Sequence, residues 1–331
     1  MIPLGKRKNR VVFAFGDPAG AKALIAYYLQ EKEAFKEGML LSDRYHSFYA
    51  NMGVEVKVCK RDNIKVLLDN FKPDIICTGT SVPEGIELEC LRYGMSKSEI
   101  FTSTFVDHWT NIKLRFLSNH GLIFPDRICV IDELAKQKCL DESIPKEKIS
   151  IIGNPYYEYL KHWKPSISRI DLFAELGLLV QNKYVLYAPE PLSTFGLEKK
   201  YGFDEIDGLN LLSTIFSGEI IHANIFLVIK CHANQNIDLI YRWLQEQKNQ
   251  VRHRVVIVKD FEINALIYYS EQVLGFFSNS LLEAQNMNKN VGRILTLLKD
   301  FSLDPIAELQ VGRSLLSVEE LTEFISENNG I

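Results

Sequence analysis

The sequence lacks any hydrophobic run long enough to cross a membrane. Its longest unbroken apolar run covers residues 23–29, whereas a membrane-spanning helix needs about 20 residues. Lysines and arginines near the N-terminus resemble the start of a signal peptide. The apolar run after them, residues 11–15, is too short for such a peptide, and Asp17 follows it closely. We therefore expect a cytoplasmic protein.

Cysteine is scarce and has no recognisable spacing. No Cys-x-x-Cys pair is present, and several cysteines lie inside apolar segments. This pattern argues against a disulfide framework and against a metal site. We expect buried, reduced thiols at the six positions, which are Cys59, Cys77, Cys90, Cys129, Cys139 and Cys231.

The chain also lacks an excess of positive charge. Its 331 residues carry 38 lysines and arginines against 42 aspartates and glutamates, a net charge of −4. Binding to nucleic acid depends on a basic surface, so we expect no nucleic-acid partner. Apolar residues make up 47% of the chain, which is enough for a sizeable core, and the length favours two domains.

Short apolar runs alternate with helical patterns along the whole chain. Runs such as residues 11–15 and 225–229 are apolar throughout and do not alternate with polar residues, which is typical of strands buried on both faces of a parallel sheet. The expected strands are residues 10–15, 53–58, 74–78, 101–106, 127–131, 149–152, 184–188, 225–229, 255–258, 273–277 and 291–295. The predicted class is α/β, with two Rossmann-like domains whose parallel sheets face an interdomain cleft.

The domain boundaries follow from a change of pattern after residue 155. We expect an N-terminal domain over residues 1–160 and a linker over 161–183. A second domain is expected over 184–313, followed by a C-terminal helix over 314–331. Parallel sheets bind ligands at the carboxyl ends of their strands, so the polar residues at those ends are the candidate site residues.

The first strand ends in residues 16–20, with the sequence GDPAG. Gly16 and Gly20 permit a tight turn and close approach of a ligand, and the helix that follows favours an anion at its N-terminus. No dinucleotide fingerprint or phosphate-binding loop is present. Asp17 is either a helix cap or a general base at the top of the first strand.

Two later strands of the first half also end in polar residues. Thr80 and Ser81 follow one strand and are candidate binding residues, whereas the acidic side chains after them, Glu84, Glu87 and Glu89, fit a solvated helix face. The next strand leads into a dense cluster. Its candidate residues are Asp107, His108, Asn111 and Arg115, and Trp109 lies among them. These side chains can transfer protons, stack on a sugar or hold a phosphate; the alternative is a hydrogen-bonded corner.

In the second half, polar residues follow three strands. Glu190 lies after the first of these, between two prolines. Lys230 and His232 come after the next and suit a phosphate, although a lone histidine also fits a structural role.

The most informative segment is residues 278–284, SNSLLEA, where a strand turns into a helix. Backbone N–H groups together with Ser278, Asn279 and Ser280 suit a phosphate. Glu283, one turn into the helix, is placed to accept two ribose hydroxyls. The alternative is an ordinary capped helix with a solvated glutamate.

This arrangement resembles the GT-B glycosyltransferases and their relative, UDP-N-acetylglucosamine 2-epimerase. The resemblance rests on the strand–Ser-x-Ser-LLEA–helix segment followed by Asn290 and Val291. It implies that Glu283 holds the nucleotide ribose and that the small residues nearby hold the diphosphate. Residues 230–233 are also similar to the Lys-x-His-Pro segment of bacterial sialyltransferase-type enzymes, with Ala233 replacing the proline. The two resemblances imply a UDP- or CMP-linked sugar as the donor.

The resulting hypothesis is a glycosyltransferase of bacterial surface-polysaccharide biosynthesis. It moves a sugar from a nucleotide donor to a glycan or glycolipid hydroxyl with inversion, in peripheral contact with the inner membrane. Asp17 is the first candidate base, and Asp107 with His108 is the second. No Asp-x-Asp motif ends a strand, so we expect no metal and no cofactor beyond the nucleotide-sugar substrate. Two alternatives stay open, namely a sugar-nucleotide epimerase or hydrolase and a binding protein without catalysis.

Overall fold

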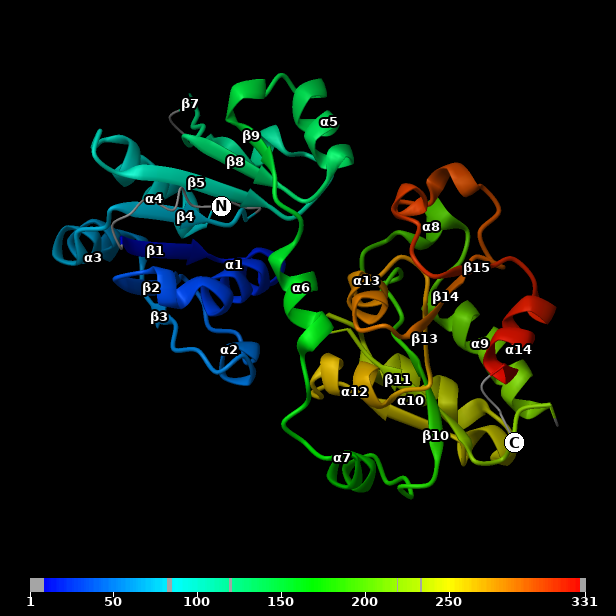
Figure 1. Cartoon of the computed structure of the whole chain (residues 1–331). Helices are drawn as coiled ribbons and strands as arrows, with labels where there is room; N and C mark the ends of the chain where they lie inside the picture. Colours follow the sequence, from blue (N-terminus) through cyan, green and yellow to red (C-terminus); the bar gives the residue numbers. More distant parts are fainter. Residues whose placement is uncertain (1–8, 82–84, 119–120, 219, 233, 328–331) are drawn as a thin grey trace. The chain divides into compact units, whose positions relative to one another are not determined.

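The computed structural model describes residues 9–81, 85–118, 121–218, 220–232 and 234–327. The chain divides into two compact units, Met1–Tyr159 (unit 1) and Leu160–Ile331 (unit 2). Each unit contains one parallel β-sheet with helices packed against it (Figure 1). The predicted α/β class with two Rossmann-like domains is confirmed. Among the described residues, no helix has the length and apolar character needed to span a membrane.

The sheet of unit 1 has seven strands in the order β3-β2-β1-β4-β5-β8-β9 among the described residues. A separate antiparallel pair joins β6 and β7. The elements of the unit are β1 (Arg10–Phe15), α1 (Pro18–Glu31), β2 (Glu37–Ser42), α2 (Phe48–Asn51), β3 (Lys57–Val58), α3 (Ile64–Phe71), β4 (Ile75–Thr78), α4 (Ile86–Met95), β5 (Phe101–Val106), β6 (Leu117–Ser118), β7 (Gly121–Leu122), β8 (Arg127–Val130), α5 (Glu133–Asp141) and β9 (Ile149–Ile151), with 3-10 turns at Lys32–Ala34, Arg61–Asn63, Lys113–Phe116 and Lys146–Lys148. Helix α6 (Pro155–His162) runs across the boundary of the two units.

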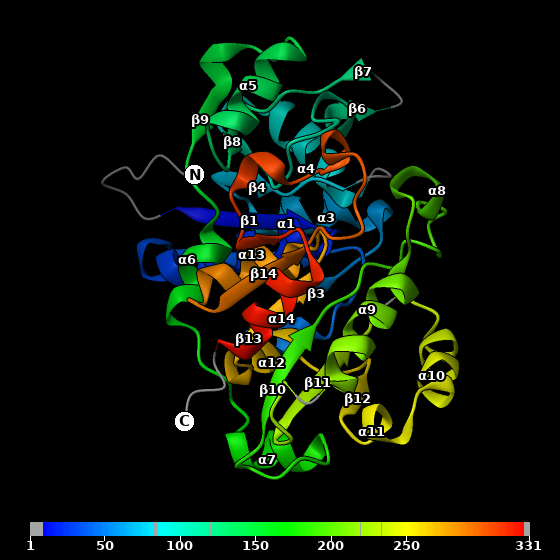
Figure 2. The ribbon, with the colours of Figure 1, turned by 90° about the vertical axis from the view of Figure 1, so that its right-hand side faces the viewer.

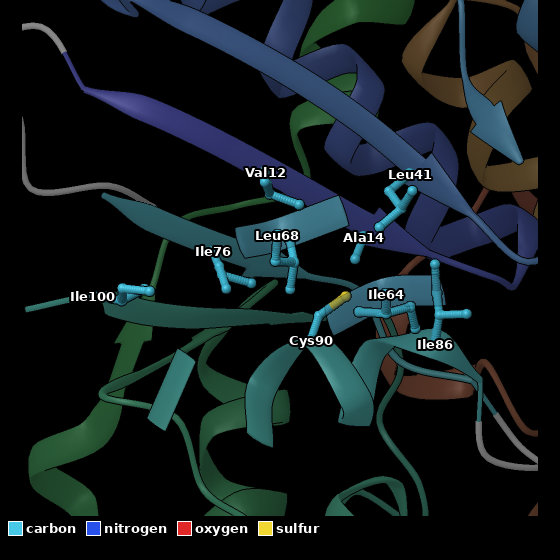
Figure 3. Packing of buried hydrophobic residues seen from close by; sticks show 9 residues of the cluster. All are labelled: Val12, Ala14, Leu41, Ile64, Leu68, Ile76, Ile86, Cys90 and Ile100. Atoms are coloured by element: carbon cyan, nitrogen blue, oxygen red, sulfur yellow. The ribbon is translucent and has the colours of Figure 1, made fainter. Parts of the chain in front are cut away.

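Strand β1 shows why the apolar runs are continuous. Its side chains alternate between the two faces of the sheet, and helices cover both faces. Val12 and Ala14 pack with residues of α3 and α4 such as Leu68 (Figure 3). Phe13 points the other way, where its ring packs against Tyr28 of α1 at a centroid distance of 5.8 Å. Residues 11–15 are all fully buried, so Arg10, at the start of β1, is the one polar residue of this strand.

The sheet of unit 2 has six strands in the order β12-β11-β10-β13-β14-β15 among the described residues, and its neighbours β10 and β11 are seen side by side in Figure 2. The elements are α7 (Arg169–Glu175), β10 (Lys183–Tyr187), α8 (Glu198–Tyr201), α9 (Glu205–Ser217), β11 (Ile225–Lys230), α10 (Ile237–Glu246), α11 (Asn249–Arg252), β12 (Val255–Val258), α12 (Ile263–Tyr269), β13 (Gln272–Gly275), α13 (Asn279–Asn286), β14 (Asn290–Ile294), β15 (Arg313–Leu315) and α14 (Val318–Ser326), with 3-10 turns at Phe301–Leu303 and Ala307–Leu309.

Each sheet reverses its strand order once. In unit 1 the chain adds β2 and β3 on one side of β1 and then places β4 on the other side. In unit 2 it adds β11 and β12 on one side of β10 and then places β13 on the other. A crevice opens at the carboxyl edge wherever neighbouring strands send their chains to opposite sides, and ligands bind there. We call the two places, β1/β4 and β10/β13, the switch points of units 1 and 2.

Two strands of these sheets, β2 and β15, are not predicted from the sequence. Strand β2 begins with Glu37 and Gly38, which are poor strand formers, and only its last three residues are buried. Strand β15 has three residues, of which only Leu315 is buried. The strand expected over residues 53–58 is wrong for its first four residues, because only Lys57–Val58 pairs with β2.

The six cysteines are free thiols, and five of them are buried. Cys77, Cys90, Cys129 and Cys139 lie in unit 1, and Cys231 lies in unit 2. Burial raises the pKa of the Cys77 thiol to about 12 and that of Cys129 to about 11. These cysteines therefore act as small apolar core residues.

Candidate functional site

The β1–α1 turn of unit 1 lies at its switch point. A Cβ atom on Gly16 would lie 2.7 Å from Ser81 Oγ, so this position has no room for a side chain. The N–H of Asp17 donates to the same Ser81 hydroxyl at 3.0 Å. Gly20 is buried in α1, and its nearest neighbours are the backbones of Gly79 and Thr80, which suits close packing of helix on strand.

Asp17 occupies the N-cap position of α1, but its side chain makes no capping hydrogen bond in the described first turn. Its carboxylate lies 3.8 Å from the guanidinium of Arg44, which also pairs with Asp43 at 2.8 Å. The Nε2 atom of His46 lies 2.9 Å from the carbonyl oxygen of Gly16. Arg44 and His46 belong to the loop after β2, and sequence reasoning missed them because it missed that strand.

Glu87 is a further residue that the sequence analysis placed wrongly. It was assigned to a solvated helix face, yet its side chain is only 2% exposed. One carboxylate oxygen accepts from the N–H of Gly16 at 2.8 Å and from the hydroxyl of Ser81 at 2.5 Å. Burial raises the pKa of Glu87, and these two donors oppose that shift. Glu89 is partly exposed and pairs with Arg92, and Glu84 lies outside the described residues.

The ends of β4 and β5 bring together three more of the predicted residues. Thr80 donates its hydroxyl hydrogen to Asp107 at 3.2 Å, and Arg115 donates to the hydroxyl oxygen of Thr80 at 3.0 Å. The guanidinium of Arg115 lies 3.8 Å from the Asp107 carboxylate. Burial raises the pKa of Asp107, and the charge of Arg115 opposes that shift. A partly buried carboxyl group with a raised pKa beside a cation is suited to proton transfer.

The other members of the Asp107 segment have local partners. The Nδ1 atom of His108 accepts from the N–H of Thr110 at 3.2 Å, and burial lowers the pKa of this imidazole. The indole N–H of Trp109 donates to Asp132 at 2.9 Å, which agrees with the hydrogen-bonded corner that the sequence left open for this residue. Asn111 is exposed and has a φ of 52°, a turn conformation that asparagine tolerates.

In unit 2 the switch point joins two segments that lie 86 residues apart in the sequence. The carboxylate of Glu190 accepts from the N–H of Phe276 at 3.3 Å and from that of Phe277 at 2.6 Å. Burial raises the pKa of Glu190 to about 7, although the N–H groups of Phe277, Phe276 and Ser278 act to lower it. Glu190 thus binds the backbone of the turn that leads into α13.

The start of α13 carries the residues expected to hold a phosphate. Ser278 is the N-cap, and its hydroxyl accepts from the N–H of Ser280 at 3.3 Å and lies 2.8 Å from the Ser280 hydroxyl. Asn279 is exposed, and no acidic residue lies in the first turn. Glu283 is buried at 8% exposure, so the solvated alternative for this residue is wrong. Helix N–H groups and two hydroxyls together form a favourable place for an anion.

The end of β11 holds the remaining two candidates. The ammonium group of Lys230 donates to the backbone oxygens of Cys231 at 3.0 Å and Lys259 at 2.6 Å. Burial lowers its pKa. The Nδ1 atom of His232 accepts from the N–H of Asn234 at 3.1 Å, and burial lowers the pKa of the imidazole. Lys230 therefore fixes the ends of β11 and β12, while its role toward a phosphate stays a prediction.

The structure thus gathers the candidates into three groups. The first group lies along the ends of β1, β4 and β5 and contains Asp17, Ser81, Thr80, Asp107 and Arg115. In the second group, Glu190 contacts the turn that carries Ser278. The third group is Lys230 and His232, at the end of β11. In the described part of the chain, no three histidine, cysteine, aspartate or glutamate side chains converge as metal ligands. A cavity of about 650 Å³ lies elsewhere in unit 1, beside the first half of β2, and is lined by residues such as Tyr28 and Phe71.

Comparison with known proteins places the fold. No family model and no curated protein matches the sequence. Solved structures match nearly the whole chain. A Listeria monocytogenes protein described as a UDP-N-acetylglucosamine 2-epimerase is 14% identical, with 98% of this chain and 89% of that chain covered and a TM-score of 0.70.

Two further solved structures contain ligands. A UDP-N-acetylglucosamine 2-epimerase of Neisseria meningitidis, bound to its UDP-sugar, is 14% identical, with 96% and 90% of the two chains covered and a TM-score of 0.61. Anabaena Alr3699/HepE, in complex with UDP and glucose, is 16% identical, with 96% and 89% covered and a TM-score of 0.59. At these identities the likeness establishes a shared GT-B-like fold, and the similarity to sialyltransferase-type enzymes stays a prediction.

Proposed function

We propose that the protein binds a nucleotide sugar at the switch point of unit 2. We further propose that it acts on this substrate alone, as an epimerase or a hydrolase. The observation that carries the proposal is the turn before α13, where two serine hydroxyls and a helix N-terminus meet at the carboxyl edge of the sheet. Similar folds that hold UDP-N-acetylglucosamine or UDP with glucose support the nucleotide-sugar class.

Each part of the site has a role in this proposal. The N–H groups and hydroxyls of Ser278 and Ser280 bind the diphosphate, and Glu283 accepts the ribose hydroxyls. The acid–base chemistry is assigned to Asp107, because its raised pKa and its contacts with Thr80 and Arg115 suit a group that exchanges protons. An epimerase or hydrolase needs such groups but no binding site for an acceptor.

Transfer of the sugar to a glycan or glycolipid hydroxyl is the second candidate function. One observation favours it: Asp17 lies at the start of the first helix, 3.8 Å from the guanidinium of Arg44. A carboxylate in that position can take a proton from an acceptor hydroxyl. The inverting course, the independence from metal and the peripheral membrane contact belong to this second candidate.

The deciding experiment follows nucleotide sugars with no acceptor present. The protein is incubated with UDP-N-acetylglucosamine and, separately, with a CMP-sugar, and the products are identified by NMR. An epimerase gives an isomeric nucleotide sugar, and a hydrolase gives free sugar plus nucleotide. Turnover that appears only after glycan acceptors are added supports the second candidate and overturns the first.

A binding panel separates catalysis from binding. Melting temperatures are measured with UDP, GDP, CMP and CDP, because a ligand at a hundredfold excess over its dissociation constant stabilises the folded state by about 2.7 kcal/mol. Stabilisation by one nucleotide without turnover of any nucleotide sugar indicates a binding protein. No stabilisation by any of the four contradicts the nucleotide site.

A further inference from the structure

The peptide group that joins Phe276 to Phe277, just after β13, is held from both sides. Its N–H, that of Phe277, donates at 2.6 Å to Glu190, which follows β10. Its carbonyl oxygen accepts from the Nε of Arg293, in β14, at 3.4 Å. Because β10 and β14 are the two neighbours of β13 in the sheet, Glu190 and Arg293 bind the same peptide from opposite sides.

The two gripping side chains are themselves fixed. Arg293 is 3% exposed and forms an ion pair with Asp304, which is also buried, so its guanidinium cannot turn away at low cost. Glu190 uses both carboxylate oxygens, one for Phe276 and the other for Phe277. Hydrogen bonds from N–H groups to an ionised carboxylate are stronger than those to a neutral acceptor.

The gripped peptide leads directly into the proposed nucleotide site. Ser278 follows this peptide directly and caps α13, which carries Ser280 and Glu283. A shift of the Phe276–Phe277 peptide therefore moves the hydroxyls and the helix start together. A misplacement of binding groups by about 1 Å can cost large factors in function.

We propose that Glu190 and Arg293 are positioning residues that hold the turn over residues 276–280 in its nucleotide-binding conformation, and that nucleotide affinity depends on the negative charge of Glu190. This inference rests on the proposed function, since it assigns the turn to the nucleotide. It adds a clamp and a pH response to that site.

The direction of the pH response follows from the ionisation of Glu190. Ionised, its two oxygens meet two N–H donors. When Glu190 is protonated, one of its oxygens carries a hydrogen that points at an N–H donor, and one of the two hydrogen bonds is lost. Since burial raises the pKa of Glu190 to about 7, nucleotide affinity should fall as the pH decreases through about 7.

Tyr187 and His232 cannot produce this trend, and the Glu190→Gln variant separates Glu190 from the other titratable groups nearby. The charged and titratable side chains on the elements around Glu190 include Tyr187 of β10, Glu198, Lys199 and Lys200 of α8, Asp204, Glu205 and Asp207 at the start of α9, Lys230 and His232 at the end of β11, Glu283 of α13, and Arg293 with Asp304 beside β14. Burial raises the pKa of Tyr187 well above its usual value, so it stays neutral. Protonation of His232 adds positive charge at low pH and would strengthen the binding of an anion, which is the opposite sign.

Calorimetry with UDP-N-acetylglucosamine provides the test, because the two phosphates of this probe stay ionised across the range. From about pH 8 to about pH 6, the ionised share of a group with a pKa of about 7 falls by about tenfold. Because the neutral form should bind about tenfold more weakly, as in Glu190→Gln, the wild-type affinity should fall by about fivefold. The Glu190→Gln variant should bind about tenfold more weakly at pH 8 and show no change between the two values. The matched control is Glu205→Gln, a buried glutamate that accepts from Ser193 and should keep the wild-type affinity and pH profile.

Hydrogen exchange of the unliganded protein tests the clamp separately from nucleotide binding. The amides of Phe276 and Phe277 should exchange faster in Glu190→Gln than in the wild type, and Arg293→Lys should loosen the same amides if the glutamine variant fails to fold. If the wild-type protein does not bind the probe, the proposed function is wrong. The hydrogen-exchange rates of the two amides then still test whether Glu190 holds the turn. Unchanged exchange, or unchanged affinity at pH 8 in Glu190→Gln, overturns the positioning role.

Discussion

The two switch points use the same device to build different surfaces. In each, a buried or partly buried glutamate accepts an N–H from the turn that follows a central strand. In unit 1, Glu87 comes from helix α4 and shares its oxygen between one N–H and a serine hydroxyl. In unit 2, Glu190 comes from the end of β10 and takes two consecutive N–H groups.

The surroundings of the two glutamates differ more than the glutamates themselves. The edge of unit 1 contains carboxylates beside arginines, such as Asp17 with Arg44 and Asp107 with Arg115. The edge of unit 2 presents hydroxyls and a helix N-terminus without an acid in the first turn. The first set suits proton transfer and the second suits an anion, which supports the proposed roles of unit 1 in chemistry and of unit 2 in nucleotide binding.

The largest expected effect tests the proposed catalytic role of unit 1. Replacing Asp107 by asparagine should slow turnover by about 10²–10⁴ with little change in melting temperature, because a general acid or base is lost. Asp17→Asn is measured alongside it, and Asp141→Asn, an exposed acid of the same unit, is the control. If Asp17→Asn alone abolishes turnover, Asp17 carries the chemistry. If neither change slows the reaction, carboxylate catalysis in unit 1 is wrong.

The next effect concerns the stability of unit 1. Glu87→Ala should lower the free energy of unfolding by about 1–3 kcal/mol, because the Gly16 N–H and the Ser81 hydroxyl lose a buried acceptor. Denaturant unfolding measures this change, and Glu89→Ala, on the partly exposed side of the same helix, is the matched control. Equal losses in the two variants would show that Glu87 does not hold the turn.

A comparable effect on binding sharpens the role of unit 2. Glu283→Gln should weaken nucleotide binding by about 1–3 kcal/mol, since a charged acceptor for the ribose hydroxyls is lost. Calorimetry with UDP gives the affinity, and a melting curve without ligand confirms that the variant folds. Unchanged affinity removes Glu283 from the site.

The last prediction concerns pH and stability at the switch point of unit 2. The pKa of Glu190 is raised from 4.5 to about 7 in the folded protein, so folding favours its neutral form. That contribution to stability is complete below about pH 4.5 and is lost as the pH rises to about 7. The stability of the wild type relative to Glu190→Gln should therefore decline over this window and stay constant above it. Parallel curves for the two proteins would contradict the raised pKa.

The architecture can be predicted from the sequence because strands that are buried on both faces of a sheet are apolar at successive positions. Continuous apolar strands such as residues 11–15 exist only where helices cover both sides of a sheet. Strand β2 lacks that pattern, since its first residue is exposed and its second is a glycine. Because β2 is not predicted, the loop after it is not recognised as part of the candidate site, and Arg44 and His46 are missed.

The site was partly visible for a similar reason. Polar residues at strand ends stand out against apolar runs, which identified Asp17, Asp107 and Ser278. Glu87 was hidden because its acidic neighbours look like a solvated face, and only the packing of α4 on the sheet shows that it points inward. The partners of Glu190 lie 86 and 87 residues away, and no local pattern predicts a contact of that range.

The buried thiols can report when each of the two units unfolds. The thiolate is the form that reacts with alkylating reagents, and burial disfavours it at Cys77 and Cys129 in unit 1 and at Cys231 in unit 2. A reagent reaches these sulfurs only when the unit around them unfolds. Peptide mapping after timed alkylation would therefore report the unfolding rate of each unit from natural residues, with no label introduced.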